Sequence, residues 1–227
     1  MATFFMRKNF LRVLASGICI VFVLLSIGYS LFLTQILCVP VYKNFYVLAT
    51  ETMHIEASAE FIKLEGGAGY VLYLDKREYV VMSIYLKKEE GEAVYASITD
   101  LKENVQLLHI SIANLYFKGN TRKKVNFYLS ALRKLESYLL VLNNCVSLLE
   151  SGATQESIKR ILLPTCKQIS YLSQSQIEEY PAYAQLCKQI GEALFNIENR
   201  VVHTRDLRYI SCELLDGYLR LFQQFKL

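Results

Sequence analysis

The sequence lacks the short motifs that carry much of enzyme and metal chemistry. It contains no HExxH, GxSxG or GxxxxGK[ST] pattern, and its six cysteines form neither a CxxC pair nor a Cys/His zinc spacing. His54, His109 and His203 are scattered, without the i,i+4 pairing of a metal site. We therefore expect a noncatalytic protein with no metal and no cofactor.

Charged residues are missing from Val13 to Tyr42, where Leu, Ile, Val and Phe dominate. About 20 apolar helical residues cross a bilayer core, so the sequence predicts a transmembrane helix over residues 13–40 after a basic cytoplasmic tail over residues 1–12. A signal peptide is the competing interpretation, but its apolar region usually spans only about 7–15 residues. The residues expected to anchor the chain are Val13, Leu24, Leu25, Leu31 and Leu37.

Basic residues beside this run indicate its orientation. Arg7, Lys8 and Arg12 precede the run, whereas Lys43 alone follows it closely. This bias places the N-terminus in the cytoplasm. We therefore expect a single-pass protein of the cell membrane, with everything after the anchor outside the cytoplasm.

Beyond Tyr42 the charges nearly cancel, with 22 basic and 21 acidic residues. This balance provides no general attraction to nucleic acid, which is not an expected partner. Four cysteines lie in this part: Cys145, Cys166, Cys187 and Cys212. They would pair in an oxidising compartment or stay as buried thiols inside helices, and we favour the thiols.

Two kinds of secondary-structure pattern divide the rest of the chain. Residues 43–113 alternate between strand-like and helix-like stretches in the order βαββαβ, with a glycine turn at residues 66–69. This order predicts a compact sheet with right-handed parallel crossovers, covered by two helices on one face and open on the other. Residues 120–227 have helical periodicity throughout, which predicts an antiparallel helical bundle. The expected fold class is α+β, with a transmembrane helix, a ferredoxin-like module and this bundle.

The βαββαβ segment resembles a SPOR (sporulation-related repeat) domain, a small module of the bacterial envelope. The resemblance rests on an aromatic opening strand, an alanine-bearing helix and a later Tyr-x-Val strand that runs into a second such helix. The matching residues are Phe45-Tyr46-Val47-Leu48-Ala49, Ala57 and Ala59, Tyr79-Val80-Val81-Met82-Ser83-Ile84-Tyr85-Leu86, and Lys87 to Ala93. The likeness covers about a third of the chain.

This resemblance implies that the open sheet face binds septal peptidoglycan, particularly glycan strands stripped of stem peptides. The candidate contacts are Tyr46, Leu48, Val80, Met82, Ile84 and Tyr85. The family often has polar residues where Leu48, Val80 and Met82 stand here, and recognition of a glycan needs hydrogen-bonding groups beside aromatic rings.

Two functions follow from these observations. The first is a noncatalytic envelope protein of cell division or sporulation, whose module binds peptidoglycan glycan or a septal partner. The second is a membrane-anchored interaction protein whose helical bundle binds a protein and whose module has lost glycan binding. A polar, open sheet face favours the first function, and an apolar, covered face favours the second.

Overall fold

The computed structural model describes residues 20–26, 36–52, 54–98, 105–118, 122–176, 178–198 and 200–225. Residues 20–26 are helical. The elements after them, in chain order, are β1 (Ile36–Glu51), α2 (Ile55–Leu64), β2 (Tyr70–Leu74), β3 (Arg77–Tyr85), α3 (Lys88–Ser97), β4 (Val105–Lys118), α4 (Arg122–Glu150), α5 (Gln155–Ser175), α6 (Pro181–Glu198) and α7 (Thr204–Gln223). The described chain is therefore α+β overall.

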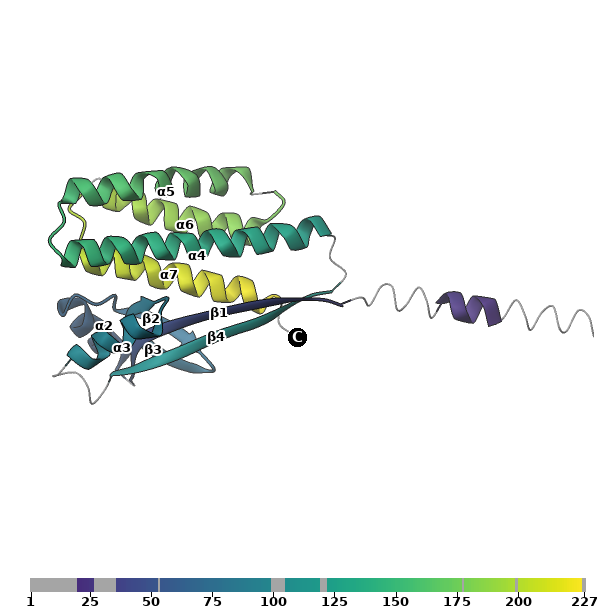
Figure 1. The fold of residues 1–227 in the computed structure, drawn as a ribbon, viewed down its shortest axis with the longest axis horizontal. Helices are drawn as coiled ribbons and strands as arrows, with labels where there is room; N and C mark the ends of the chain where they lie inside the picture. Colours follow the sequence, from purple (N-terminus) through teal and green to yellow (C-terminus); the bar gives the residue numbers. More distant parts are fainter. Residues whose placement is uncertain are drawn as a thin grey trace, which may run out of the picture.

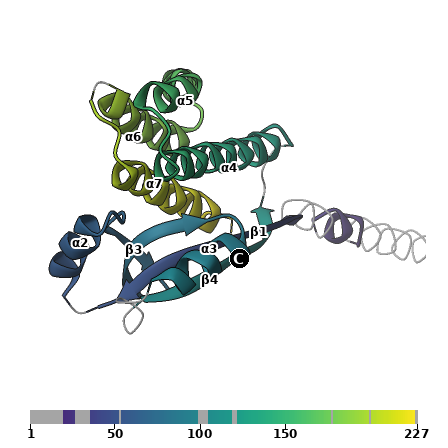
Figure 2. The same ribbon diagram turned by 60° about the vertical axis from the view of Figure 1, so that its left-hand side comes forward.

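The four strands form one sheet in the order β2-β3-β1-β4. Every neighbouring pair is antiparallel. The pairing of β1 with β4 runs from Ile36 opposite Lys118 to Thr50 opposite Val105, so these two strands form a long ribbon. Helices α2 and α3 lie on one face of the sheet, and the bundle of α4 to α7 lies on the other (Figures 1 and 2).

A β-bulge interrupts the pairing of β1 with β3. Leu48 pairs with Ser83 and Ala49 pairs with Val81, so Met82 has no opposite residue. The carbonyl oxygen of Met82 accepts a hydrogen bond from the N–H of Ala68, 2.8 Å away. An extra residue in one strand reverses which face each later side chain points to. The alternation of side chains between the two sheet faces is therefore reversed after Met82 in β3.

The turn before β2 depends on its glycines. Gly69 has a φ of +59°, and a Cβ built there would lie 2.5 Å from the carbonyl oxygen of Ala59. At Gly67 a Cβ would lie 2.5 Å from the side chain of Ile62 and 3.2 Å from the Cα of Met82. Only glycine allows so close an approach of α2, the turn and β3.

The helical region forms because each helix carries an apolar stripe that its neighbours cover. Thr154 caps α5, since its Oγ1 accepts a hydrogen bond from the N–H of Ser157 at 3.3 Å. Gly217 of α7 brings α6 close, because a Cβ there would lie 2.3 Å from Leu186 Cδ1. Pro164 is accommodated inside α5.

The bundle and the sheet share one hydrophobic core. Phe45 of β1 packs edge-on against Tyr218 of α7, with ring centroids 5.3 Å apart. Five polar contacts cross the same boundary, and they are Lys43 Nζ to Glu136 Oε1 (2.6 Å), Tyr70 Oη to Asp216 Oδ2 (2.8 Å), Asn143 Nδ2 to the Ile84 carbonyl (3.1 Å), Arg208 Nη1 to the Gly66 carbonyl (2.7 Å) and the Tyr116 N–H to the Phe225 carbonyl (2.8 Å). Residues 36–225 thus pack as one body over the described ranges.

The fold class predicted from the sequence is wrong in its anchor. None of the helices in the described ranges is both long enough and apolar enough to cross a membrane. Residues 36–40, expected at the end of a transmembrane helix, begin β1, because β4 supplies hydrogen-bonding partners for their backbone. Leu37 is therefore a strand residue. Leu24 and Leu25 lie in the helical stretch 20–26, whereas Val13 and Leu31 lie outside the described residues.

The predicted sheet also needs correction. Helix α2 connects β1 to β2 and α3 connects β3 to β4, and the two strands of each pair run in the same direction, but an antiparallel strand lies between them in the order β2-β3-β1-β4. The second sheet face was expected to be open, but the bundle covers it (Figure 2). The physical reason is that both faces of the central strands carry apolar side chains, which are stable only when both are shielded from water.

Candidate functional site

Three of the six predicted contact residues lie under α2 and α3. Leu48, Val80 and Met82 are 1%, 0% and 8% exposed, in a cluster that includes Ala59 and Ile62 of α2. Their side chains form the core beneath the helices. These three residues therefore contact no ligand in this conformation.

Ile84 points to the opposite face. It is 4% exposed and belongs to the core shared with the bundle. Strict alternation would place Ile84 beside Val80 and Met82, but the bulge at Met82 reverses the phase of the strand. The structure thus separates residues that the sequence placed on one surface.

The face on which a SPOR-like module would bind glycan is apolar and sealed. Phe45, Val47, Ala49 and Val81 point toward the bundle, and none is more than 1% exposed. Helix α7 packs directly against β3 and β2. A sugar has no access to this surface without separation of the bundle from the sheet.

Tyr85 and Tyr46 remain at least partly accessible. Tyr85 Oη accepts a hydrogen bond from Ser83 Oγ at 2.7 Å, and burial raises the pKa of this tyrosine. Tyr46 stacks on His109, with ring centroids 5.0 Å apart and an interplanar angle of 6°. His109 Nε2 lies 3.0 Å from Asn44 Oδ1.

A hollow of about 370 Å³ adjoins this stacked pair. Its lining residues come from β1, α3 and β4, and they are Tyr46, Lys88, Glu92, Tyr95, Leu107 and His109. Lys88 and Glu92 form an ion pair of 3.0 Å. Aromatic rings beside charged groups match the apolar face and the hydroxyl edge of a sugar. Of the six predicted contact residues, Tyr46 alone lines this hollow.

Sequence reasoning missed His109 and Tyr95 in this hollow. His109 lies opposite Tyr46 only through the register of β1 and β4, which depends on long-range pairing. Tyr95 lies in a helix that the sequence predicted, but the sequence did not show which side of that helix faces β1 and β4. The alternation of Asn44, Tyr46 and Leu48 along β1 was the available signal, because it places these three side chains on one face.

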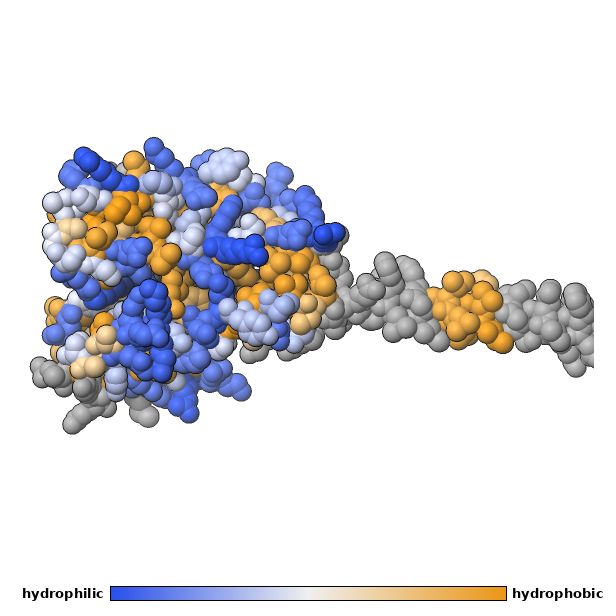
Figure 3. All heavy atoms as spheres, viewed as in Figure 1, coloured by the Kyte–Doolittle hydropathy of each residue, from blue (hydrophilic) through white to orange (hydrophobic). Residues whose placement is uncertain are grey.

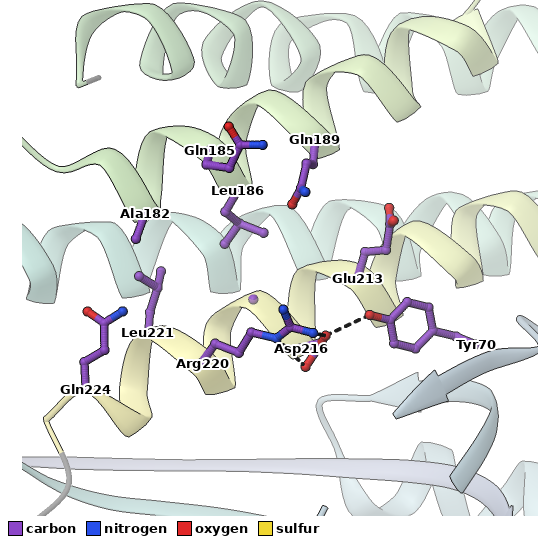
Figure 4. Close-up of a pocket in the computed structure, with 11 residues that line it drawn as sticks. Tyr70, Ala182, Gln185, Leu186, Gln189, Glu213, Asp216, Arg220, Leu221 and Gln224 are labelled. Atoms are coloured by element: carbon purple, nitrogen blue, oxygen red, sulfur yellow. Dashed lines mark hydrogen bonds and ion pairs between the residues drawn. The ribbon is translucent and has the colours of Figure 1, made fainter. Parts of the chain in front are cut away.

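A second concave region lies between α6 and α7, beside the start of β2 (Figure 4). Its volume is about 480 Å³. Asp216 Oδ2 accepts hydrogen bonds from Tyr70 Oη at 2.8 Å and from Arg220 Nη2 at 2.7 Å, and Asp216 Oδ1 accepts one from Arg220 Nε at 3.3 Å. Burial is the main cause that raises the pKa of Tyr70, and the hydrogen bond to Asp216 adds to it. We call this region the α6–α7 groove.

The described cysteines form no disulfide with one another. Cys145, Cys166, Cys187 and Cys212 are buried and Cys38 is exposed, which confirms the buried-thiol interpretation for the four helical cysteines. Burial raises the pKa of Cys145 and of Cys187 to about 11. Over the described ranges, no three His, Cys, Asp or Glu side chains gather closely enough to hold a metal ion.

Comparisons with protein-family models, curated proteins and solved structures find no match to this chain. The resemblance of residues 43–113 to a SPOR domain therefore stays a prediction from the sequence.

Proposed function

We propose that this protein is a noncatalytic, membrane-associated interaction protein of the bacterial envelope, in which a SPOR-like module supports a helical bundle that binds a protein partner. One observation carries this proposal: the sheet face that would read glycan is apolar and sealed by the bundle. The sheet acts as a platform that holds α7 and α4 in place. The outer surfaces of the bundle are then the surfaces left for a partner.

The outer bundle surface includes exposed apolar side chains. Leu140 of α4 is 50% exposed and Tyr171 of α5 is 69% exposed. Figure 3 shows such hydrophobic areas on the bundle, separated by hydrophilic side chains. A non-obligate protein interface is about as apolar as the rest of a protein surface, so a surface of this mixed kind is compatible with one.

Association with a membrane is proposed from the apolar run before β1. Its described helical residues are exposed, from 54% at Val21 to 70% at Phe22. They form an almost wholly hydrophobic surface (Figure 3). Such a surface is stable when lipid or detergent covers it.

Contact with peptidoglycan through Tyr46 and His109 is a second candidate function. It is favoured by the stacking of the half-buried Tyr46 ring on the exposed His109 ring and by the charged groups in the adjoining hollow. This candidate keeps Tyr46 of the predicted glycan site and replaces the buried residues with α3 and β4 side chains.

One sedimentation experiment separates the two candidates. The full chain in mild detergent is mixed with peptidoglycan sacculi, with and without amidase treatment. The interaction proposal expects no binding that depends on stripped glycan. Binding that requires stripped glycan, disappears in Tyr46→Ala and survives in Tyr42→Ala would establish the second candidate instead; Tyr42 is a suitable control because it is 75% exposed on the same strand.

Photo-crosslinking tests the bundle surface directly. A photoreactive amino acid at position 171 should give a discrete cross-linked protein in cells that produce the chain, and one at position 73 should not. Tyr73 is a matched control, since it is a tyrosine of the module and is 61% exposed against 69% for Tyr171. Equal yields from both positions would contradict a bundle-specific partner.

A further inference from the structure

The α6–α7 groove contains a carboxylate without a partner among the described residues. Glu213 of α7 lines the groove and is partly buried, and neither a hydrogen bond nor an ion pair joins it to another side chain in the described ranges. Its neighbour Asp216 is different, because Tyr70 and Arg220 already donate to both of its oxygens. The Glu213 carboxylate can thus accept hydrogen bonds from a ligand in this groove without losing a partner among the described residues.

Three amide side chains also line the groove. Gln185 and Gln189 lie on α6, with the Gln189 side chain pointing toward α7, and Gln224 lies at the end of the groove away from Glu213 (Figure 4). An amide donates and accepts hydrogen bonds, as a hydroxyl group does, so the three amides are suited to hydroxyl groups. A carboxylate accepts only, and its strongest partners are positively charged donors.

The floor of the groove is apolar. Leu186 lies against Gly217, where a Cβ would be only 2.3 Å from Leu186 Cδ1, and Leu221 completes the lining on α7. The absence of a side chain at Gly217 keeps this floor low. The volume of about 480 Å³ falls within the range of about 300–1,000 Å³ that is common for small-molecule sites.

We propose that the α6–α7 groove binds a small hydroxylated primary amine, whose ammonium group pairs with Glu213 and whose hydroxyl groups bond Gln185 and Gln189. Its carbon skeleton packs on Leu186 and Leu221. The Tyr70–Asp216–Arg220 network forms the adjoining wall and connects the groove to β2. This groove shares no lining residue with the Tyr46 hollow and contains neither Leu140 nor Tyr171, so its binding can be tested independently of the proposed function.

The test is isothermal titration of the full chain in mild detergent with three probes. Glucosamine carries both an ammonium and hydroxyl groups, glucose carries hydroxyl groups alone, and putrescine carries ammonium groups alone. We expect saturable binding of glucosamine. Glucose should bind at least about tenfold more weakly, because it lacks the hydrogen bond to a charged group that contributes about 1.5–3 kcal/mol, and putrescine should also bind about tenfold more weakly, because it lacks at least two neutral hydrogen bonds of about 0.5–1.5 kcal/mol each. Glucose or putrescine binding as tightly as glucosamine, or no saturable binding of glucosamine, would overturn the proposal.

Variants assign the binding to the groove. Glu213→Gln should weaken glucosamine binding about tenfold or more, and Gln189→Ala should weaken it by a smaller factor. Glu192→Gln is the matched control, because Glu192 is an exposed carboxylate of α6 outside the groove lining. This variant should bind glucosamine as tightly as the unchanged chain does. Thermal unfolding by circular dichroism shows whether each variant is folded. A folded Glu213→Gln protein with unchanged affinity would refute the assignment.

Discussion

Removal of the Phe45 ring tests whether the bundle seals the sheet. Phe45 is 1% exposed between the sheet and α7, and its ring packs edge-on against Tyr218 with centroids 5.3 Å apart. A buried Phe→Ala change costs about 3–5 kcal/mol, as the sum of lost transfer free energy and of the cavity left behind. The stability of a typical domain is about 5–15 kcal/mol, so Phe45→Ala should remove a large share of the free energy of unfolding.

Urea unfolding of the full chain in mild detergent measures this loss. Far-UV circular dichroism follows the helices, and tyrosine fluorescence follows tertiary packing, since the chain has 16 tyrosines and no tryptophan. Both signals should shift together to lower urea, because Phe45 belongs to the core that the sheet and bundle share. Phe61→Ala is the control: Phe61 is 47% exposed on α2, and its removal should cost less than about 1 kcal/mol.

Two results would refute this reasoning. A loss below about 1 kcal/mol for Phe45→Ala would mean that the ring is solvated, as on an open sheet face. Separate transitions for the helical signal and the tertiary signal would mean that the bundle and the sheet unfold independently.

Arg208, the buried cysteines and Glu213 provide three further predictions. Arg208→Ala removes the hydrogen bonds from Arg208 Nη1 to the Gly66 carbonyl and from Nη2 to Glu150, and it should lower the free energy of unfolding in urea by about 1.5–3 kcal/mol. The control is Arg205→Ala at an exposed position, which should change this free energy very little, and equal losses in the two variants would contradict a bridging role for Arg208. In the native chain at about pH 8 a maleimide should label Cys38 well before the four buried helical thiols, because burial keeps the reagent away from them, and labelling of Cys38 and these four at one rate would show that the helices are not packed as described. Burial, with Asp216 adding to it, raises the pKa of Glu213, so the folded chain loses stability as the pH rises from the ordinary carboxyl range through that raised pKa. Glu213→Gln should therefore raise the melting temperature near about pH 7 and not near about pH 4, and a lower melting temperature at neutral pH would contradict this sign.

Local pattern predicted the module's elements well. The glycine turn predicted at residues 66–69 lies between α2 (Ile55–Leu64) and β2 (Tyr70–Leu74), as the predicted order of elements requires. Both elements are bounded by turn residues and have an unambiguous period. The elements of residues 43–113 follow the order βαββαβ along the chain, although the pairing of the strands differs from the expectation.

The prediction failed where long-range pairing decides the structure. Residues 36–40 read as the end of an apolar helix, because apolar content alone does not distinguish a helix from a buried strand. Their pairing with β4 makes them β1, and nothing within the run itself signals that partner. The prediction of the glycan-binding residues was wrong for a similar reason. The bulge at Met82 reverses the faces to which later residues of β3 point, and this bulge is defined only by the register of β3 with β1.

The sequence of β3 nevertheless contained a signal for the sealed face. All six residues from Tyr79 to Ile84 are buried, and five of them are apolar. A strand with one face open to solvent or to a polar ligand alternates apolar and polar side chains, whereas a strand covered on both faces has a nearly continuous apolar run. The glycan hypothesis requires the alternating pattern, whereas residues 79–84 form the nearly continuous apolar run of a strand that is covered on both faces. Val80 and Met82 of this run are covered by α2 and α3, and Val81 and Ile84 are covered by the bundle, so the apolar strand is shielded from water on both faces.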